Sequence, residues 1–133
     1  MIAKLKDISG CLSLLNETNE KHFNRKKFGL AIKNKNSIFL VTKEKGKVVG
    51  YVIGFVTPSD YTQAILQETR VSVKHRKKGI GTKLVVEFLK EAKKRKVTTI
   101  GAVVDEKDRI GIAFYNCLNF KKQGNWKWFE KKL

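Results

Sequence analysis

The stretch that decides the fold is Val71-Ser-Val-Lys-His-Arg-Lys-Lys-Gly-Ile-Gly-Thr82, in which a β-branched run leads through a basic loop into two glycines. Beyond it, apolar residues recur at four-residue steps, which predicts an amphipathic helix from residue 79 to about 96. The first N–H groups of a helix have no intrahelical partner, and the helix dipole adds partial positive charge there. Gly79 and Gly81 lack a Cβ and let the backbone approach a ligand closely. The junction therefore predicts an anion site.

The segments on either side of this junction alternate between helical and strand patterns. We expect helices over residues 9–19, 23–32 and 108–118, strands over residues 37–42, 48–56, 61–73 and 98–104, and a final strand pair within residues 120–132. Gly46 can take a positive φ in the first hairpin turn. In the third strand, Ile65, Thr69, Val71 and Val73 fall on one alternate set, as expected of residues that share a face.

These elements predict the α+β fold class. We expect a mixed, largely antiparallel twisted sheet of about six to seven strands, with helices on both faces. The length of 133 residues and the mass of 15.2 kDa fit a single domain over residues 1–133. A net charge of +17 combined with 41% apolar residues argues against a disordered basic tail, because the apolar residues can form a core.

The sequence also indicates the cellular compartment of the protein. The longest apolar stretch, residues 48–56, contains two glycines and is far shorter than the roughly 20 residues that a membrane-spanning helix needs. Charged residues at positions 4, 6 and 7 interrupt the apolar run that a secretory signal requires, so we expect a cytoplasmic protein. Cys11 and Cys117 each fall in an apolar helical pattern and are expected to be reduced core thiols.

The spacing of the loop residues narrows the choice of anion. A Walker A loop does not fit, because the spacing Gly-x-x-x-x-Gly-Lys-Ser/Thr is absent. A dinucleotide fingerprint does not fit either, because it would need a third glycine where Leu84 stands. The loop instead has the spacing Arg-x-x-Gly-x-Gly, formed by Arg76, Gly79 and Gly81. In this order of elements it resembles the pyrophosphate-binding motif of the GCN5-related N-acetyltransferase (GNAT) family. The resemblance extends over residues 71–120, and the hairpin at residues 37–56 is also similar to the family core.

The resemblance implies an acetyl-CoA-dependent N-acetyltransferase that passes the acetyl group directly to a primary amine of a small molecule, peptide or protein. It implies Tyr115 as general acid for the leaving thiolate and Glu68 as the base that deprotonates the attacking ammonium. Strand backbone around Val71 and Val73 would hold the thioester oxyanion. The residues implied in coenzyme binding are Val71, Val73, Arg76, Lys77, Lys78, Gly79, Ile80, Gly81, Thr82, Asp108 and Phe114.

Several of these residues also have a structural interpretation. Glu68 could be a solvated or salt-bridged strand residue near Arg70, and Tyr115 could be a core aromatic. Asp108 stands where the family often has asparagine, which affects the expected contact with the pantetheine arm. His22 has no neighbouring cysteine or carboxylate cluster in the sequence, so the sequence indicates no metal site.

Basic residues are concentrated in residues 21–35, 74–96 and 121–133. Such a basic face attracts polyanions and steers acidic ligands, although lysine-rich surfaces also occur as solvated or thermally adapted faces. The alternative function is therefore a basic nucleic-acid- or ribosome-associated protein on a catalytically inactive acetyltransferase-like fold.

The acceptor site is the part that the resemblance leaves least defined. It places this site at residues 9–33 and 121–132, where Trp126, Trp128 and Phe129 could form a wall of the site or only cover the sheet. The basic rim hints at an acidic acceptor, such as an acidic peptide or a phosphate-bearing metabolite. The resemblance is compatible with a monomer or a homodimer.

Overall fold

A computed structural model of the chain describes residues 1–59, 61–125 and 127–133. Asp60, expected in the turn after the second strand, and Trp126, expected at the acceptor site, lie outside the described residues. The chain forms two compact units, residues 1–103 and 104–133, and each is described by itself. The single domain over residues 1–133 stays a prediction.

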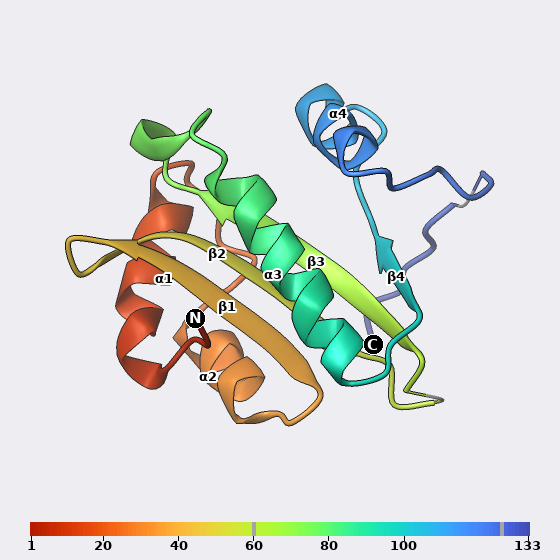
Figure 1. The fold of residues 1–133 in the computed structure, drawn as a ribbon, viewed down its shortest axis with the longest axis horizontal. Coiled ribbons are helices and arrows are strands. Elements are labelled where there is room, and N and C mark those ends of the chain that lie inside the picture. Colours follow the sequence, from red (N-terminus) through yellow and green to blue (C-terminus); the bar gives the residue numbers. More distant parts are fainter. Residues whose placement is uncertain (60, 126) are drawn as a thin grey trace. The chain divides into compact units, whose positions relative to one another are not determined.

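The first unit is built on one sheet of four strands in the order β1-β2-β3-β4 (Figure 1). Its strands are β1 (Ser37–Glu44), β2 (Lys47–Val56), β3 (Gln63–Val71) and β4 (Thr99–Ala102). Strands β1, β2 and β3 are antiparallel, and β4 joins β3 in parallel. The mixed, largely antiparallel sheet is therefore confirmed. The positive φ expected at Gly46 in the β1–β2 turn is also confirmed, at 78°.

The expected number of strands is wrong for the described residues. Within residues 121–125 and 127–133 the chain contains no strand, so the final strand pair expected in residues 120–132 is missing from this part. All of these residues are exposed, and lysines recur along them. A strand register needs one face that is buried, and the described residues of this segment offer none.

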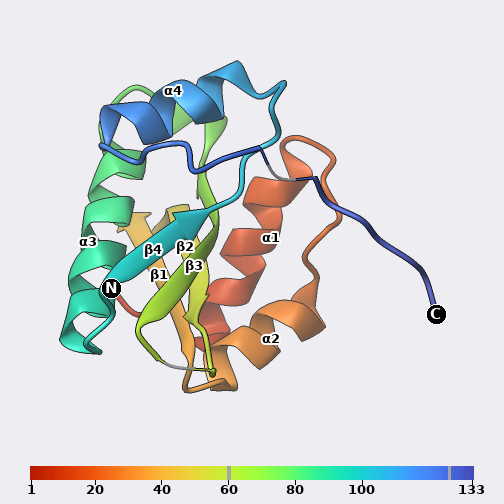
Figure 2. The same ribbon diagram turned by 90° about the vertical axis from the view of Figure 1, so that its right-hand side faces the viewer.

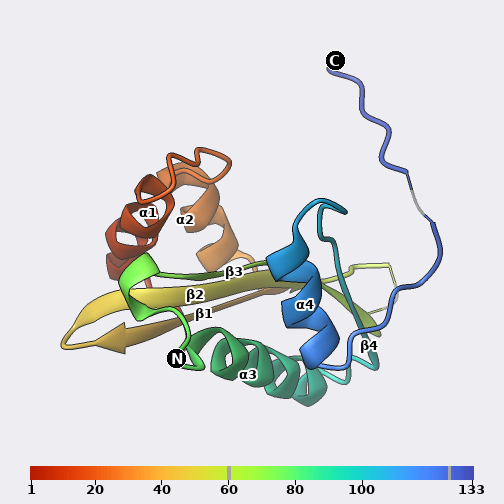
Figure 3. The same ribbon diagram turned by 90° about the horizontal axis from the view of Figure 1, so that it is seen from above.

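Helices cover both faces of the sheet, as expected (Figures 2 and 3). A short 3-10 turn (Leu5–Asp7) leads into α1 (Ile8–Asn16), which lies with α2 (Arg25–Lys33) on one face. Asn24 starts α2, because its side chain accepts a hydrogen bond from the Lys27 N–H at 2.8 Å. Helix α3 (Ile80–Lys94) lies on the other face and buries Leu84, Val85, Phe88 and Ala92 against the strands.

The two cysteines differ in their surroundings. Cys11 is fully buried on α1, and burial raises the pKa of its thiol to about 12. Cys117 is a free thiol at the end of α4 (Arg109–Cys117), but it is exposed. The expectation of a core thiol is thus confirmed for Cys11 and wrong for Cys117, whose helical pattern does not reveal which face is covered.

Strand β3 contains an extra residue relative to β2. Leu66 lies opposite Gly54 and Glu68 lies opposite Ile53, which leaves Gln67 without a partner on β2. Side chains alternate between the two faces of a strand, and one extra residue shifts this alternation by one position. Before Gln67 the even-numbered residues of β3 point to one face of the sheet, and after Gln67 the even-numbered residues point to the other face.

This shift places the polar end of β3 beneath α1 and α2. A Cβ at Gly54 would lie 2.6 Å from Phe88 Cζ, so Leu66, opposite Gly54, is on the α3 face. Ile53 belongs to the core that packs under α1 and α2, so Glu68, opposite Ile53, faces those helices. A polar side chain on β3 is thereby directed at the segment that links α1 to α2.

The sequence pattern did not show this reversal. It predicted a shared face for Ile65, Thr69, Val71 and Val73, but Gln67 separates Ile65 from Thr69 and Val71. Val73 lies beyond the strand, in the 3-10 turn η2 (Val73–His75). That prediction is therefore wrong, because periodicity alone cannot register an inserted residue.

Strand β4 pairs only with the first half of β3. The paired residues run from Gln63 with Thr99 to Leu66 with Ala102, whereas β3 continues to Val71. The edge of β3 beyond Leu66 is thus not covered by β4. Among the residues described, no helix is both long enough and apolar enough to cross a membrane.

Candidate functional site

The start of α3 presents backbone donors to an open surface. Gly79 is the N-cap with φ 80°, and no side chain caps the helix. The Lys83 N–H donates to the Gly79 carbonyl at 3.0 Å, so the N–H groups of residues 80–82 precede the first intrahelical bond. A Cβ added at Gly79 would meet nothing within 4 Å. The backbone and the helix dipole together can hold an anion at this point.

The side chain of Ile80 is turned away from that surface. Gly50 on β2 lets α3 begin close to the sheet, because a Cβ there would lie 3.0 Å from Leu84 Cδ1 and 3.2 Å from Ile80 Cγ2. Ile80 is half-buried against the strand. Its side chain therefore faces the sheet, and its backbone N–H is the group that a ligand at the helix start would meet.

The loop before α3 is basic and exposed. Lys77 takes a positive φ of 63°, and Arg76, Lys77 and Lys78 are all exposed, as is Thr82 on the first turn. Arg76 Nε donates to the Val71 carbonyl at 3.3 Å, so the guanidinium lies back over the end of β3. These cations surround the open helix start and add charge to its dipole.

A carboxylate holds the end of β3. The Val73 N–H donates to Glu17 Oε2 at 3.0 Å, and Ser72 Oγ donates to Glu17 Oε1 at 2.9 Å. The Ser72 N–H donates to the Val49 carbonyl at 2.8 Å. Val73, predicted to help hold the thioester oxyanion, thus has its N–H engaged by the residue that follows α1.

Removing this carboxylate should release the Val73 amide. In a Glu17→Ala variant, we expect hydrogen exchange of the Val73 amide to accelerate about fivefold to tenfold, which corresponds to a hydrogen bond of about 1 kcal/mol. The Ser72 amide, bonded to Val49, serves as an internal control, and Glu17→Gln should keep most of the protection. Unchanged exchange at Val73 in the alanine variant would contradict this contact.

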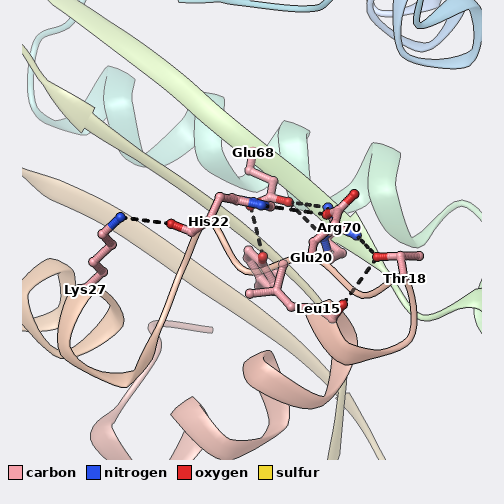
Figure 4. Close-up of polar contacts among 8 residues, drawn as sticks. Leu15, Thr18, Glu20, His22, Lys27, Glu68 and Arg70 are labelled. Atoms are coloured by element: carbon pink, nitrogen blue, oxygen red, sulfur yellow. Dashed lines mark hydrogen bonds and ion pairs between the residues drawn. The ribbon is translucent and has the colours of Figure 1, made fainter. Parts of the chain in front are cut away.

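Glu68 lies in a polar cluster, here called the Glu68 cluster and formed by Glu20, His22, Tyr51, Glu68 and Arg70. All of these except Tyr51 are labelled in Figure 4. Glu68 Oε2 accepts from the Tyr51 hydroxyl at 3.0 Å and lies 2.9 Å from His22 Nε2. Glu68 Oε1 accepts from Arg70 Nε at 2.8 Å, and Arg70 Nη2 also pairs with Glu20. Both carboxylate oxygens of Glu68 are therefore engaged.

Burial and charge shift the pKa values of two groups in the cluster, Tyr51 and Arg70. Burial, followed by the charge of Glu68, raises the pKa of Tyr51 well above its ordinary value, so the phenol remains a donor. Burial alone would lower the pKa of Arg70, but the hydrogen bond and charge of Glu68 outweigh it and raise the pKa. The ion pair between Glu68 and Arg70, which the structural interpretation of Glu68 expected, is present. The role of Glu68 as a base stays a prediction.

The structure corrects the sequence analysis at His22. Its ring lies beside two carboxylates, and one ligand atom from each of Glu20, His22 and Glu68 falls within 4.8 Å of the others. Arg70 already pairs with both carboxylates, and its positive charge disfavours a dication at the same place. The arrangement favours an ion-pair network over a metal centre. No sequence pattern connects His22 with Glu68, because they are 46 positions apart.

The second unit contains the remaining predicted residues. Asp108 caps α4, since its Oδ1 accepts from the Gly111 N–H at 2.9 Å. The half-buried Tyr115 ring lies between Phe114 and Phe120, with ring centroids 5.2 Å away on each side. The aromatic packing of Tyr115 is thus present, and the roles of Asp108, Phe114 and Tyr115 toward the coenzyme stay predictions.

Comparison with known proteins matches the chain to a family model and to a curated protein. The model of the acetyltransferase (GNAT) family matches residues 8–120. An L-2,4-diaminobutyric acid acetyltransferase from Virgibacillus pantothenticus is 31% identical over 65 residues, which cover 49% of this chain and 41% of that protein. The chain is thus aligned with less than half the length of this relative.

Solved structures show the same fold at low sequence identity. An aminoglycoside 6'-N-acetyltransferase from Acinetobacter haemolyticus has a TM-score of 0.84 and 17% identity, covering 100% of this chain and 97% of its own. The ribosomal-protein-S18-alanine N-acetyltransferase from Escherichia coli gives 0.81 and 19%, covering 93% and 77%. The PaiA N-acetyltransferase from Thermoplasma acidophilum, in complex with coenzyme A, gives 0.81 and 16%, covering 92% and 89%.

The family match spans the basic glycine junction, the sheet and α4, and the shared fold agrees with it. A chain that matches over residues 8–120 and folds in this way belongs to the acetyltransferase (GNAT) family.

Proposed function

We propose that the protein is an N-acetyltransferase that binds acetyl-CoA at the junction of β3 and α3 and passes the acetyl group directly to a primary amine. The observation that carries this proposal is the open, uncapped start of α3, where Gly79 adopts φ 80° among exposed cations. Family membership supports the identity of the anion as the coenzyme pyrophosphate.

The residues of the junction fit a pyrophosphate. The backbone N–H groups of residues 77–82, which include Gly79, Ile80, Gly81 and Thr82, would surround it. The side chains of Arg76, Lys77 and Lys78 would add charge-assisted hydrogen bonds. The uncovered edge of β3 as far as Val71 would receive the pantetheine arm, since an extended chain can pair with a free strand edge. These assignments need no side-chain rearrangement around Gly79, where the space is open.

Chemistry would occur beside the same uncovered edge. Backbone near Val71 and Val73 would stabilise the oxyanion, and the Val73 N–H can do so only by leaving Glu17. Tyr115 would protonate the departing thiolate, with Phe114 packed beside its ring and Asp108 capping the helix that carries both. Acceptance of the ammonium proton is the remaining step, and Glu68 has both oxygens engaged.

Relatives suggest the class of acceptor. One is named for L-2,4-diaminobutyric acid, one for aminoglycosides and one for an alanine of ribosomal protein S18. All three are amine acceptors, so we propose a primary amine here as well. An acidic acceptor and a nucleic acid on the basic face remain predictions from the net charge of +17.

The direct test is acetylation by the purified protein. L-2,4-diaminobutyrate and the aminoglycoside sisomicin serve as probe amines, acetyl-CoA as donor, and mass spectrometry and free-thiol release as readouts. We expect acetylated amine and free coenzyme A in equal amounts, because each transfer breaks one thioester. Thiol release without acetylated amine, or no release at all, would contradict the proposal.

A further inference from the structure

His22 lies outside the Arg-x-x-Gly-x-Gly motif, and its imidazole is a group that can accept a proton. It belongs to the segment between α1 and α2, and its side chain is 47% exposed. Its Nε2 lies 2.9 Å from Glu68 Oε2, and its Nδ1 lies 3.9 Å from Glu20 Oε2 (Figure 4). Nε2 is therefore held by Glu68 on the sheet, and Nδ1 lies toward Glu20, the more exposed of the two carboxylates.

The partners of Glu68 assign the ring proton. An ionised carboxylate only accepts hydrogen bonds, so Nε2 of a neutral His22 carries the proton and donates it to Glu68 Oε2. The lone pair is then on Nδ1. This is the arrangement of a general base whose second nitrogen is oriented by a carboxylate.

Charged groups face the His22 ring and its backbone from several sides. The carboxylates of Glu20 and Glu68 flank the imidazole on its two nitrogens. Arg70 pairs with both carboxylates, and the Tyr51 hydroxyl donates to Glu68. From the other side, Lys27 Nζ donates to the His22 carbonyl at 3.1 Å. Two carboxylates, one guanidinium and one ammonium thus lie around His22, and their formal charges cancel, so a transient imidazolium meets no excess of positive charge.

His22 also lies at the right part of the sheet. Glu68 follows Leu66, the last β3 residue that pairs with β4, by two positions. The imidazole is thus held at the beginning of the uncovered edge of β3, which the proposed function assigns to the pantetheine arm and thioester. The extra residue Gln67 is what turns Glu68 toward His22.

We propose that Nδ1 of His22 receives the proton of the acceptor ammonium and that Glu68 is the positioning residue that orients the ring through Nε2. This inference rests on the proposed function. The ammonium loses one proton to Nδ1, and the freed lone pair forms the C–N bond while the C–S bond breaks. Tyr115, the proposed general acid, protonates the departing sulfur, which leaves as the thiol, and a second proton from the substrate nitrogen restores the Tyr115 hydroxyl. His22 returns its proton to water.

The test measures kcat and KM between pH 6 and pH 10 for the wild type and His22→Gln, with the same two probe amines. At pH 7 we expect kcat of His22→Gln to fall on the order of 100-fold, the usual contribution of a general base. The KM for acetyl-CoA should be unchanged. The loss should shrink as the pH approaches about 10, where an alkylammonium loses its proton to solution. A structural defect would instead reduce the rate equally at every pH.

Two further variants complete the test. Lys45→Gln alters an exposed lysine in the β1–β2 turn, away from the proposed site, and should retain the wild-type pH profile. Glu68→Gln should lower kcat with the same pH dependence as His22→Gln, because the ring loses its orientation. A His22→Gln enzyme with the wild-type rate, or with a pH-independent loss, would overturn the inference. A wild-type protein that acetylates neither amine would overturn the proposed function itself, and with it this role of His22.

Discussion

Replacing both Gly79 and Gly81 by alanine is expected to weaken acetyl-CoA binding by about 100-fold or more. Gly79 has φ 80°, which a side chain disfavours. In the proposed site, a Cβ at either position would stand where the pyrophosphate would meet the backbone. Loss of even one charge-assisted hydrogen bond costs about 1.5–3 kcal/mol, or roughly tenfold to 100-fold in affinity. Isothermal titration calorimetry with acetyl-CoA measures the effect.

The first hairpin supplies a matched control. Gly46 has nearly the same backbone conformation, φ 78°, and an added Cβ there would also meet nothing within 4 Å. Gly46→Ala and Gly79→Ala should therefore destabilise the fold by similar amounts, about 1 kcal/mol. Only the variants at the helix start should lose affinity for the coenzyme. Equal acetyl-CoA affinity in all of these variants would contradict a site at the start of α3.

Gly54→Ala is expected to lower the free energy of unfolding by about 3 kcal/mol. The added Cβ would lie 2.2 Å from the Ile65 carbonyl oxygen and 2.6 Å from Phe88 Cζ, and the first of these atoms belongs to the backbone. Strand β3 or helix α3 must then move. Since the extra residue Gln67 lies next to this contact, the orientation of Glu68 should change as well. Urea unfolding and the acetylation rate report the two effects.

In helix α2, a glycine-to-alanine substitution should raise the free energy of unfolding instead of lowering it. Gly29 lies within α2, and an added Cβ would meet nothing within 4 Å. Gly29→Ala should therefore stabilise the protein by up to about 1 kcal/mol, because alanine has the higher helix propensity. If Gly54→Ala were as stable as the wild type, the close approach of β2, β3 and α3 at this glycine would be wrong.

The parts of the fold that could be predicted are those with local signals. The glycines and cations of residues 76–81 predicted the junction, and the four-residue apolar period predicted α3. The hairpin was recognisable from Gly46, because a tight turn needs a residue that tolerates positive φ. Each of these features depends on neighbours within one or two turns of chain.

The parts that could not be predicted depend on distant partners. The reversal of β3 arises where Gly54 meets Phe88, and Gly54 inside an apolar strand was its only signal in the sequence. Glu17 reaches Val73 across 56 positions, and His22 reaches Glu68 across 46. Periodicity carries no record of such contacts. The final strand pair was expected around a turn at Gly124 and Asn125, although residues 121–125 and 127–133 have no buried face.

The most direct measurement of the central claim is calorimetric titration of the purified protein with acetyl-CoA and with adenosine diphosphate, at low and at moderate salt. A basic protein of net charge +17 attracts any anion at low salt, but screening weakens such attraction. The account predicts micromolar binding of acetyl-CoA that survives moderate salt and exceeds that of the diphosphate. No binding, or binding of both ligands that disappears with salt, would contradict it.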